Sequence, residues 1–524
     1  MEARADAAST SPPASRDALR PPVAPAALRD AYDAEGFRRA AHEAVDQLAD
    51  YLSQITAPAA KRLTGRAVPV LPWTAPDEAL AEWRRRLSAA GAPGAELAER
   101  LRFLLDGVLA GATHLHHPRY TGHQVPPVLP AAVVGDLVAS LLNNSVTIYE
   151  MGGPGTVLER EAIRWMADVL GLGDRADGVL TSGGSLGNLT ALLAARQLRS
   201  GFDAWSTGLA GERPLAVLGS SAAHYSVARS LQVMGLGKDG FVPVQVDERL
   251  RLRPEALEEA FDGAERTGRR VFAVVASSCA TAAGTFDPLE EIADFCAARG
   301  LWLHVDGAHG AAAALSDQYR HLVAGIERAD SVVWDAHKLL LVPSLVTGVV
   351  FREAGDAYAA FEHEASYLYE GRDIREWFNI SRRTLECTKP MLALRLWCVL
   401  AAHGREFFAA YIDHVFGMAR RFGRRIAAAP DFELPVEPES NIVAFRYVPA
   451  DGARFGTEGP DRAGGLDRLQ TRIRRRLIES GEFYLTQARL PAGVHLRTVL
   501  MNPLTTDGDL DALLDGIREA ARDG

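Results

Sequence analysis

Short apolar and β-branched runs alternate with stretches of helical pattern between about residues 155 and 350. The runs are GVLTS, PLAVLGS, VFAVVAS, LWLHVD, SVVWD and TGVVF, and a helical stretch follows each of the first four. Strand–helix alternation favours a parallel or mostly parallel sheet that helices cover on both faces. The sequence therefore predicts an α/β fold for this region.

Polar clusters follow these strands where each strand ends. They read TSGGS, SSAAHYS, SSCATAAGT, DGAH and DAHK. Ligands of open α/β sheets bind outside the carboxyl ends of the strands. We therefore expect the clusters to form one site at that edge of the sheet.

The first cluster is a glycine-rich turn that opens a helix, in TSGGSLGNLTALLAAR from Thr181 to Arg196. Free backbone N–H groups and the helix dipole make a helix N-terminus an anion site. Gly183 and Gly184 let the backbone approach an anion closely, and Ser185 adds a hydroxyl donor. A helix that is simply capped after a strand would have the same pattern.

Asp306 stands at the end of a buried strand, in LWLHVDGAHGA. A carboxylate there is costly without a partner. It could cap a helix, or it could hold a ligand cation such as a protonated pyridine nitrogen, with the small Ala308 against a flat ring. His224, in SSAAHYSVARS, could stack on that ring, or it could be a capping or core histidine.

Lys338 follows the run SVVWDAH and precedes more Leu and Val. Burial disfavours the ammonium form, so we expect a lowered pKa and a lysine that can attack a carbonyl. A surface lysine just past a strand is the alternative. His337, beside it, could donate to a phosphate.

Taken together, the clusters predict a site for pyridoxal phosphate. An anion cradle at Gly184 and Ser185, a stacking His224, a ring-nitrogen carboxylate at Asp306 and a nucleophile at Lys338 each follow a predicted strand. With this cofactor the protein supplies orientation and electrostatics, and Lys338 would form the Schiff base.

The same residues resemble a known family. TSGGSLGN, AHYS, HVDGAHG and DAHK are similar to segments of the group II pyridoxal-phosphate-dependent amino acid decarboxylases, which include the glutamate, aromatic-L-amino-acid and 2,4-diaminobutyrate enzymes. HPRY (117–120), YEMGGPGTVLERE (149–161) and LRTVLMNPLTT (496–506) also resemble family segments. The resemblance implies the fold type I architecture of aspartate aminotransferase, with a large mostly parallel sheet, an N-terminal helical arm and a smaller α+β domain.

The resemblance also implies a role for each matching residue. Gly184, Ser185 and His337 would hold the phosphate. His224 would stack on the ring, Ala308 would pack on it, Asp306 would pair with the pyridine nitrogen, and Thr281 would lie close to the cofactor. His224, Asp306 and Lys338 would take part in catalysis. The segment around Thr281 reads Cys279-Ala280-Thr281, where the commoner family form is Gly-Thr-Thr, which puts the surroundings of Thr281 in doubt.

Further residues are implied for the substrate side. Tyr367, with Tyr369 as a competitor, would protonate the carbon that has lost CO2, although both could be ordinary loop residues. Arg497 would lie near the substrate carboxylate, unless it forms a surface ion pair. His123 and Gln124 are candidate pocket residues.

Pattern and resemblance divide the chain into four parts. We expect a disordered tail over 1–26, a helical dimerisation segment over 27–130, a large cofactor-binding domain over 131–400 and a small C-terminal domain over 401–524. The family implies a homodimer with shared active sites.

Composition excludes several classes of partner. The net charge of −10 argues against nucleic acid, which requires a basic face. The sequence contains no run of about 18 apolar residues, so we expect no membrane span. Four cysteines without CxxC spacing favour a reducing cytoplasm. HLHHP (114–118) lacks companion ligands, so we predict no metal.

The sequence thus predicts decarboxylation of an L-amino acid to its amine. The alternatives are an aldehyde synthase that couples decarboxylation to oxidative deamination, another lyase or aminotransferase on this fold, and a cofactor-free scaffold. The order of the family segments favours the glutamate and diaminobutyrate branches, while aromatic and aliphatic substrates stay open.

Overall fold

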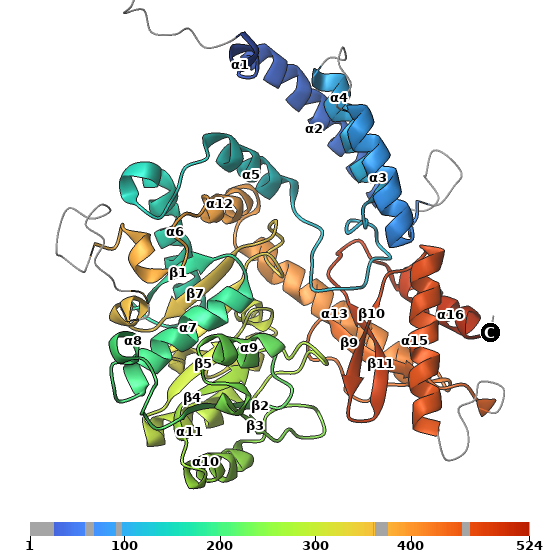
Figure 1. The fold of residues 1–524 in the computed structure, drawn as a ribbon. Coiled ribbons are helices and arrows are strands. Elements are labelled where there is room, and N and C mark those ends of the chain that lie inside the picture. The colour runs from blue at the N-terminus through green and yellow to red at the C-terminus, as the bar shows by residue number, and fades with distance from the viewer. Residues whose placement is uncertain are drawn as a thin grey trace, which may run out of the picture. The chain divides into compact units, whose positions relative to one another are not determined.

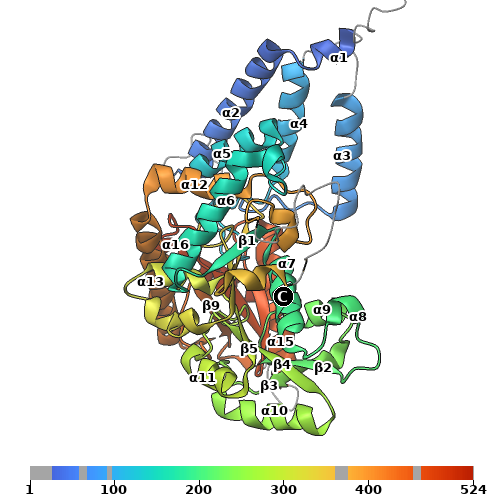
Figure 2. The same cartoon turned by 90° about the vertical axis from the view of Figure 1, so that its left-hand side faces the viewer.

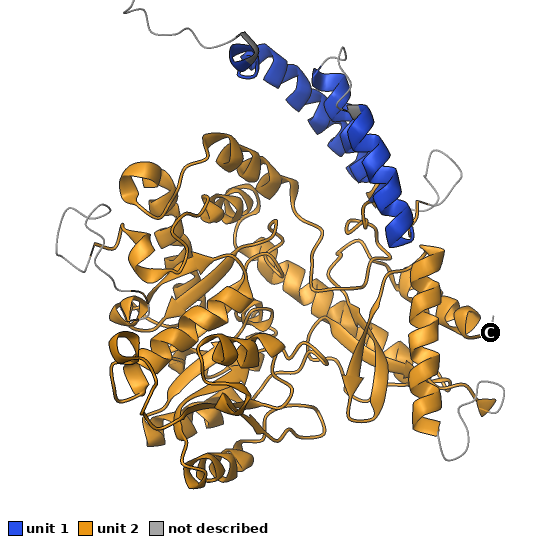
Figure 3. Cartoon of the chain, in the orientation of Figure 1, with its two compact units in different colours: residues 1–54, 74–111 blue, residues 55–73, 112–524 orange. Residues whose placement is uncertain are grey.

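The computed structural model describes residues 26–57, 68–90, 97–359, 361, 376–452 and 462–522. The chain forms two compact units, residues 1–54 with 74–111 and residues 55–73 with 112–524 (Figure 3). The first unit is helical and contains α1 (Ala26–Asp30), α2 (Ala34–Thr56), α3 (Pro76–Ala90) and α4 (Leu97–Gly111). Within it, Gln47 Nε2 donates to Asp106 Oδ1 at 2.9 Å, which joins α2 to α4.

The second unit contains a seven-stranded sheet (Figure 1), in the order β1-β7-β6-β5-β4-β2-β3. The strands are β1 (Asp177–Thr181), β2 (Leu215–Ser220), β3 (Phe241–Val244), β4 (Arg270–Ser277), β5 (Trp302–Asp306), β6 (Ser331–Asp335) and β7 (Thr347–Phe351). β3, β2, β4, β5 and β6 are parallel, and β7 runs antiparallel to both β6 and β1. The predicted mostly parallel α/β fold is confirmed. Within this sheet, the sequence analysis did not predict the short strand β3 or the antiparallel direction of β7.

Alternation along the strands divides the apolar side chains between two cores. Val179, Val217 and Val275 belong to one core, and their neighbours Leu180, Leu218 and Val274 belong to the other. Successive strand side chains point to opposite faces, so a strand that is apolar throughout must be covered twice. The first core is completed by α7 (Gly184–Arg199) and α9 (Tyr225–Val233), and the second by α6 (Tyr149–Leu170), α11 (Leu289–Arg299) and α13 (Glu406–Ala428).

Further α-helices among the described residues of this unit are α5 (Pro130–Leu142), α8 (Ala204–Thr207), α10 (Leu257–Arg266), α12 (Leu392–His403), α15 (Arg462–Ser480) and α16 (Asp507–Arg522) (Figure 2). Helix α5 begins with Pro130, whose fixed φ suits the first helical position. Among the helices of the described residues, none is long and apolar enough to cross a membrane.

A second, antiparallel sheet has the order β10-β11-β9-β8. Its strands are β8 (Phe432–Glu433), β9 (Ile442–Tyr447), β10 (Thr486–Leu490) and β11 (Gly493–Val499). Helix α13 joins the two sheets: Phe408 and Ile412 pack into the core of the large sheet, and Phe422 and Ile426 into that of the small sheet. The small sheet is therefore attached to the large one by a continuous helix.

A buried ion pair fastens the end of β1. Lys389 Nζ donates to Glu159 Oε1 of α6 and to the carbonyl oxygen of Leu180, and Glu159 Oε1 also accepts the N–H of Leu180. The Lys389 side chain is 0% exposed and that of Glu159 is 3% exposed. Burial lowers the pKa of Lys389, and Glu159 opposes that shift. Removing one partner would leave the other charge buried alone.

We expect Lys389→Met to destabilise the protein by about 3–5 kcal/mol, because it strands the Glu159 carboxylate in the interior. The thermal unfolding midpoint at a fixed scan rate measures this. The double variant Lys389→Met/Glu159→Gln keeps the acceptor for Leu180 without the charge and should recover much of the loss. An unchanged midpoint in the single variant would show that the pair is dispensable.

Candidate active site

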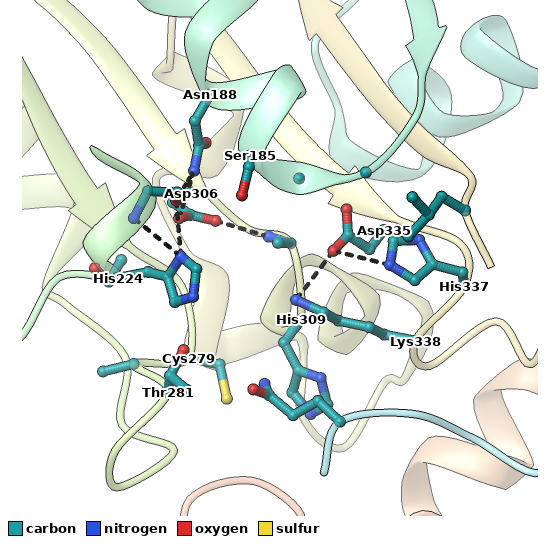
Figure 4. Close-up of a pocket in the computed structure, with 18 of the residues that line it drawn as sticks. Ser185, Asn188, His224, Cys279, Thr281, Asp306, His309, Asp335, His337 and Lys338 are labelled. Atoms are coloured by element: carbon teal, nitrogen blue, oxygen red, sulfur yellow. Dashed lines mark hydrogen bonds and ion pairs between the residues drawn. The ribbon is translucent and has the colours of Figure 1, made fainter. Parts of the chain in front are cut away.

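A cavity of about 410 Å³ lies at the carboxyl ends of the large-sheet strands (Figure 4). This volume is within the roughly 300–1,000 Å³ of ordinary ligand pockets. The residues predicted from the sequence that line it are Gln124, Gly184, Ser185, His224, Thr281, Asp306, Ala308, His337 and Lys338. The polar clusters that end β1, β2, β4, β5 and β6 thus meet in one place.

The N-terminus of α7 forms one wall of the cavity. Gly183 has φ +100°, a conformation that favours glycine. A Cβ on Gly184 would lie 3.1 Å from both carboxylate oxygens of Asp335 and 3.4 Å from Ala308 Cβ. The first residues of a helix have no intrahelical partner for their N–H groups, so this wall can bind an anion.

Asp306 ends β5 with its side chain at the cavity. Its Oδ2 accepts a hydrogen bond from Asn188 Nδ2 at 2.9 Å, and its Oδ1 accepts one from the Ala308 N–H at 3.3 Å. Asp306 therefore caps the turn after its strand and not a helix, since the N-cap of the next helix, a 3-10 helix over Gly310–Leu315, is His309. Its side chain also lines the cavity, and its pairing with a ligand cation stays a prediction.

His224 caps a helix, as one of its two interpretations from the sequence has it, and its stacking on a ring stays a prediction. It is the N-cap of α9, where its Nδ1 accepts the Ser226 N–H at 3.3 Å. Its ring lines the cavity as well. Burial lowers the pKa of His224, against an opposing effect of Asp306. The imidazole is therefore held toward its neutral form.

Lys338 follows β6 and its side chain is 21% exposed, with Nζ 3.0 Å from Asp335 Oδ2. The expectation of a lowered pKa is wrong for this arrangement. Burial alone would lower the pKa of Lys338, but the carboxylates of Asp335 and Asp306 outweigh burial and raise it above its ordinary value. Asp335 also accepts a hydrogen bond from Thr347 Oγ1 and lies 3.6 Å from His337 Nε2.

The substrate-side predictions have mixed outcomes. Gln124 and Thr281 line the cavity, while His123 and Arg497 do not. The His123 ring lies 5.8 Å from that of Tyr484. Tyr367 and Tyr369 fall outside the described residues.

Arg497 is buried in β11, at 7% exposure, so the alternative of a surface ion pair is wrong. Its Nη1 donates to the carbonyl oxygen of Thr281 at 2.6 Å, and its Nε donates to Thr486 Oγ1 at 3.1 Å. Within the described part of the chain, no carboxylate forms an ion pair with Arg497. The positive charge of Arg497 is thus not compensated, and its guanidinium contacts Thr281, which lines the cavity.

Several lining residues were not singled out in the sequence. Asn188 lies one helical turn after Gly184, a spacing that could have placed it on the same side of α7. Asp335 is part of the quoted DAHK. His309 and Cys279 also lie inside quoted clusters, DGAH and SSCATAAGT, but no role was predicted for them. His309 Nδ1 is buried without a partner, and burial raises the pKa of the Cys279 thiol to about 12. That thiol is not poised to act as a nucleophile.

The HLHHP histidines have other partners. His116 Nε2 lies 3.0 Å from the carbonyl oxygen of Val128, and His117 Nδ1 accepts the Arg119 N–H at 3.0 Å. Over the residues that the structure describes, no three His, Cys, Asp or Glu side chains are grouped to hold a metal ion.

The cavity fits pyridoxal phosphate by its donor set. The N-terminus of α7, where there is little space for a side chain at Gly184, suits a phosphate. Asp306 offers a carboxylate for a ring nitrogen. His309 Nδ1 is a buried polar atom that lacks a partner beside this space. Lys338 supplies the amine for the aldehyde.

Comparisons with known proteins agree with this fit. Residues 104–448 match the family model described as the pyridoxal-dependent decarboxylase conserved domain. Cysteine sulfinic acid decarboxylase of Rattus norvegicus is 31% identical over 484 residues, covering 91% of this chain and 96% of the relative. Aromatic-L-amino-acid decarboxylase of Bacillus atrophaeus is 29% identical over 431 residues, covering 82% and 86%. A crystal structure of mouse CSAD superposes with a TM-score of 0.84 at 28% identity, covering 94% of this chain and 100% of that one.

We expect Asp335→Asn to lower the pKa of Lys338, because burial lowers this pKa and the variant removes one of the two carboxylates that raise it. With the raised pKa, the Lys338–Asp335 pair stabilises the fold below the ordinary lysine value of 10.5 and loses that effect only as the pH rises through the higher folded value. At mildly alkaline pH, Lys338 of the cofactor-free variant should therefore react faster with an amine-directed reagent than wild-type Lys338.

Peptide mass spectrometry across a pH series measures the reaction, with the exposed Lys238 as the internal reference. Equal Lys338 rates in the variant and the wild type would contradict the assignment of Asp335 as the counter-ion.

Proposed function

This chain belongs to the pyridoxal-dependent decarboxylase family, and from that premise we propose that Lys338 is the lysine that binds the cofactor covalently. The enzyme is a pyridoxal-phosphate-dependent amino acid decarboxylase. The observation that supports Lys338 is its place in a cavity that also contains Asp306, His224 and the N-terminus of α7. The reaction proposed in full is conversion of an L-amino acid to the corresponding amine and CO2.

Pyridoxal phosphate, when bound, supplies an electron sink for the pair left behind as CO2 departs. Asp306 would pair with the ring nitrogen, and its own hydrogen bonds from Asn188 and Ala308 keep the carboxylate in place. His224, held as the cap of α9, would lie against the ring, and Ala308 would leave room for it. Orientation of this kind is a large part of what a protein contributes to such a reaction.

The phosphate end would be held by Gly184, Ser185 and His337. The α7 N-terminus offers N–H donors, and His337 is fixed by contacts of its Nδ1 with Val346, 2.8 Å from the carbonyl oxygen. Thr281 would lie beside the cofactor because it lines the same cavity. These residues bind and orient, and they need not exchange protons.

Proton movement would centre on two side chains. Lys338 must lose a proton to attack a carbonyl, and Asp335 Oδ2, at 3.0 Å, is the nearest carboxylate to its Nζ. Tyr367, with Tyr369 as its competitor, is the proposed donor to the carbon after CO2 leaves. A general acid of this kind is typically worth about 10²–10⁴-fold in rate.

We infer an acidic amino acid as the first substrate class to test. Relatives of similar identity are named as cysteine sulfinic acid, acidic amino acid and aromatic-L-amino-acid decarboxylases. The buried and uncompensated guanidinium of Arg497, bonded to the carbonyl oxygen of Thr281, supports a carboxylate nearby, which every amino acid substrate carries, so the acidic class is inferred from the names of the relatives. Gln124 and His123 are the proposed neighbours of the substrate side chain.

A homodimer with shared active sites is proposed for the assembly. Helix α5 exposes the apolar side chains Val134, Leu137, Val138, Leu141 and Leu142. An exposed apolar patch of this kind is typical of a protein interface. The segment over 27–130 is the proposed dimerisation segment, 131–400 the cofactor-binding domain and 401–524 the small domain, in a cytoplasmic protein.

Purified protein with added cofactor should release CO2 and one amine from cysteine sulfinate, glutamate, aspartate, 2,4-diaminobutyrate, L-dopa or another L-amino acid. Lys338→Ala should abolish the product, because no other described amine lines the cavity. Chromatography of amines together with CO2 detection measures the reaction.

Tyr367→Phe serves as the matched variant, and we expect it to bind cofactor while forming amine more slowly. Aldehyde and ammonia in place of amine would replace the decarboxylase proposal with an aldehyde synthase. Full activity of Lys338→Ala would overturn the assignment of the lysine.

A further inference from the structure

Five buried side chains, those of Trp302, Ser331, His304, Asn188 and Asp306, are linked by hydrogen bonds behind the cavity. We call this series the hydrogen-bond relay. Trp302 Nε1 donates to Ser331 Oγ, which lies 2.9 Å from His304 Nδ1. His304 Nε2 lies 2.9 Å from Asn188 Oδ1, and Asn188 Nδ2 donates to Asp306 Oδ2 at 2.9 Å. All five residues are buried, and Trp302 also packs in an apolar core, whereas the other four side chains are polar.

The two ends of the hydrogen-bond relay determine the direction of every hydrogen bond in it. The Trp302 indole can only donate, and an Asp306 carboxylate can only accept. Asn188 must therefore turn its amide nitrogen to Asp306, which leaves its oxygen facing His304 Nε2. That oxygen requires a proton on Nε2.

His304 completes the argument on the other side. Burial lowers the pKa of His304 to about 4, so its ring is neutral near pH 7. A neutral ring with its proton on Nε2 has an acceptor at Nδ1. Ser331 must then donate its hydroxyl proton to Nδ1 while it accepts from Trp302.

A branch of the hydrogen-bond relay reaches the other cavity residue. Asn188 Nδ2 also donates to Ser226 Oγ at 2.9 Å, and Ser226 Oγ lies 2.7 Å from His224 Nδ1. The Ser226 N–H points at the same Nδ1 from 3.3 Å. Since Nδ1 accepts, neutral His224 carries its proton on Nε2.

We propose that Asn188, His304 and Ser331 are positioning residues that orient the Asp306 carboxylate and place the proton of His224 on Nε2. This inference rests on the proposed roles of Asp306 and His224 at the cofactor. One amide, that of Asn188, connects both groups, so a change in the sheet behind it alters two contacts of the cofactor together. Buried networks of this kind are strongly coupled because each member lacks water as a substitute partner.

The charged groups that act on His224 come from several elements. They are Asp306 at the end of β5, Asp335 at the end of β6, Lys338 after β6 and Arg229 within α9. The variants described below change none of these four charged residues. A shift in the pH midpoint of the bound-cofactor absorbance would therefore come from the hydrogen-bond relay and not from a lost charge.

The test compares His304→Leu, which removes the donor to Asn188, with His304→Gln, whose amide can still donate to Asn188. The measurements are the cofactor dissociation constant of the full-length protein and the pH midpoint of the bound-cofactor absorbance. We expect His304→Leu to weaken cofactor binding about tenfold and to shift the midpoint, because an Asn188 amide that has lost its donor no longer holds its hydrogen bond to the Asp306 carboxylate. His304→Gln should stay within about threefold of the wild type.

Two further variants keep the test decisive. Ser331→Ala removes the donor to His304 Nδ1 with a smaller change in volume, and decides the matter if His304→Leu does not fold. Gln470→Leu is the control, because it removes buried hydrogen bonds to Tyr447 in the small sheet, away from the cavity. Lower stability with unchanged midpoint and affinity in both relay variants would overturn the proposal.

The tautomer of His224 has its own measurement. Nitrogen-15 NMR of ring-labelled histidine in the holoprotein, with the His224 signal identified by its loss in His224→Asn, should show a protonated Nε2 and an unprotonated Nδ1. The opposite tautomer would overturn the relay. Both readouts need only bound cofactor, so a protein that forms no amine would overturn the proposed function and leave this test intact.

Discussion

Two carboxylates lie buried at the carboxyl edge of the large sheet, and the cost of burying them dictates what surrounds them. Asp335 is 2% exposed and has Lys338, His337 and Thr347 as partners. Asp306 has the amide of Asn188 and the N–H of Ala308. A buried charge without such partners would cost several kcal/mol, so Lys338 and Asn188 are needed beside the two aspartates for their burial as well as for any chemistry.

The scaffold that holds these groups is rigid for reasons of packing. Strand side chains enter two separate cores, one on each face, so no strand can shift by one residue without exchanging its two faces. The Lys389–Glu159 pair holds Leu180, just before the turn that leads into α7. The Lys389–Glu159 pair, which lies outside the cavity, thus helps to position the turn at Gly184.

The small sheet contributes to the same site from a distance in sequence. Arg497, in β11, donates to the carbonyl oxygen of Thr281, which follows β4. Helix α13 is shared between the cores of both sheets and holds them together. Specificity in such an enzyme depends on a few polar groups around a shared cavity, which agrees with similar relatives being named for acidic and for aromatic substrates.

The sequence by itself determined the fold class and the order of the clusters. Strand–helix alternation predicts a mostly parallel sheet, and the carboxyl ends of parallel strands meet at one edge, so Gly184, His224, Asp306 and Lys338 could be grouped from their spacing alone. Their protonation could not be read from spacing. Lys338 was expected to have a lowered pKa from its apolar neighbours, but Asp335 lies 3.0 Å away and raises it.

Only the tertiary structure decided which groups satisfy one another. The hydrogen bond from Arg497 to Thr281 and the bonds that link Trp302 to Asp306 through Ser331, His304 and Asn188 join residues from separate elements, up to 216 positions apart for Arg497 and Thr281. Hydrogen bonds and charge compensation depend on distances of about 3 Å. Periodicity in a sequence specifies which face a side chain points to, but it does not specify its partner to that accuracy.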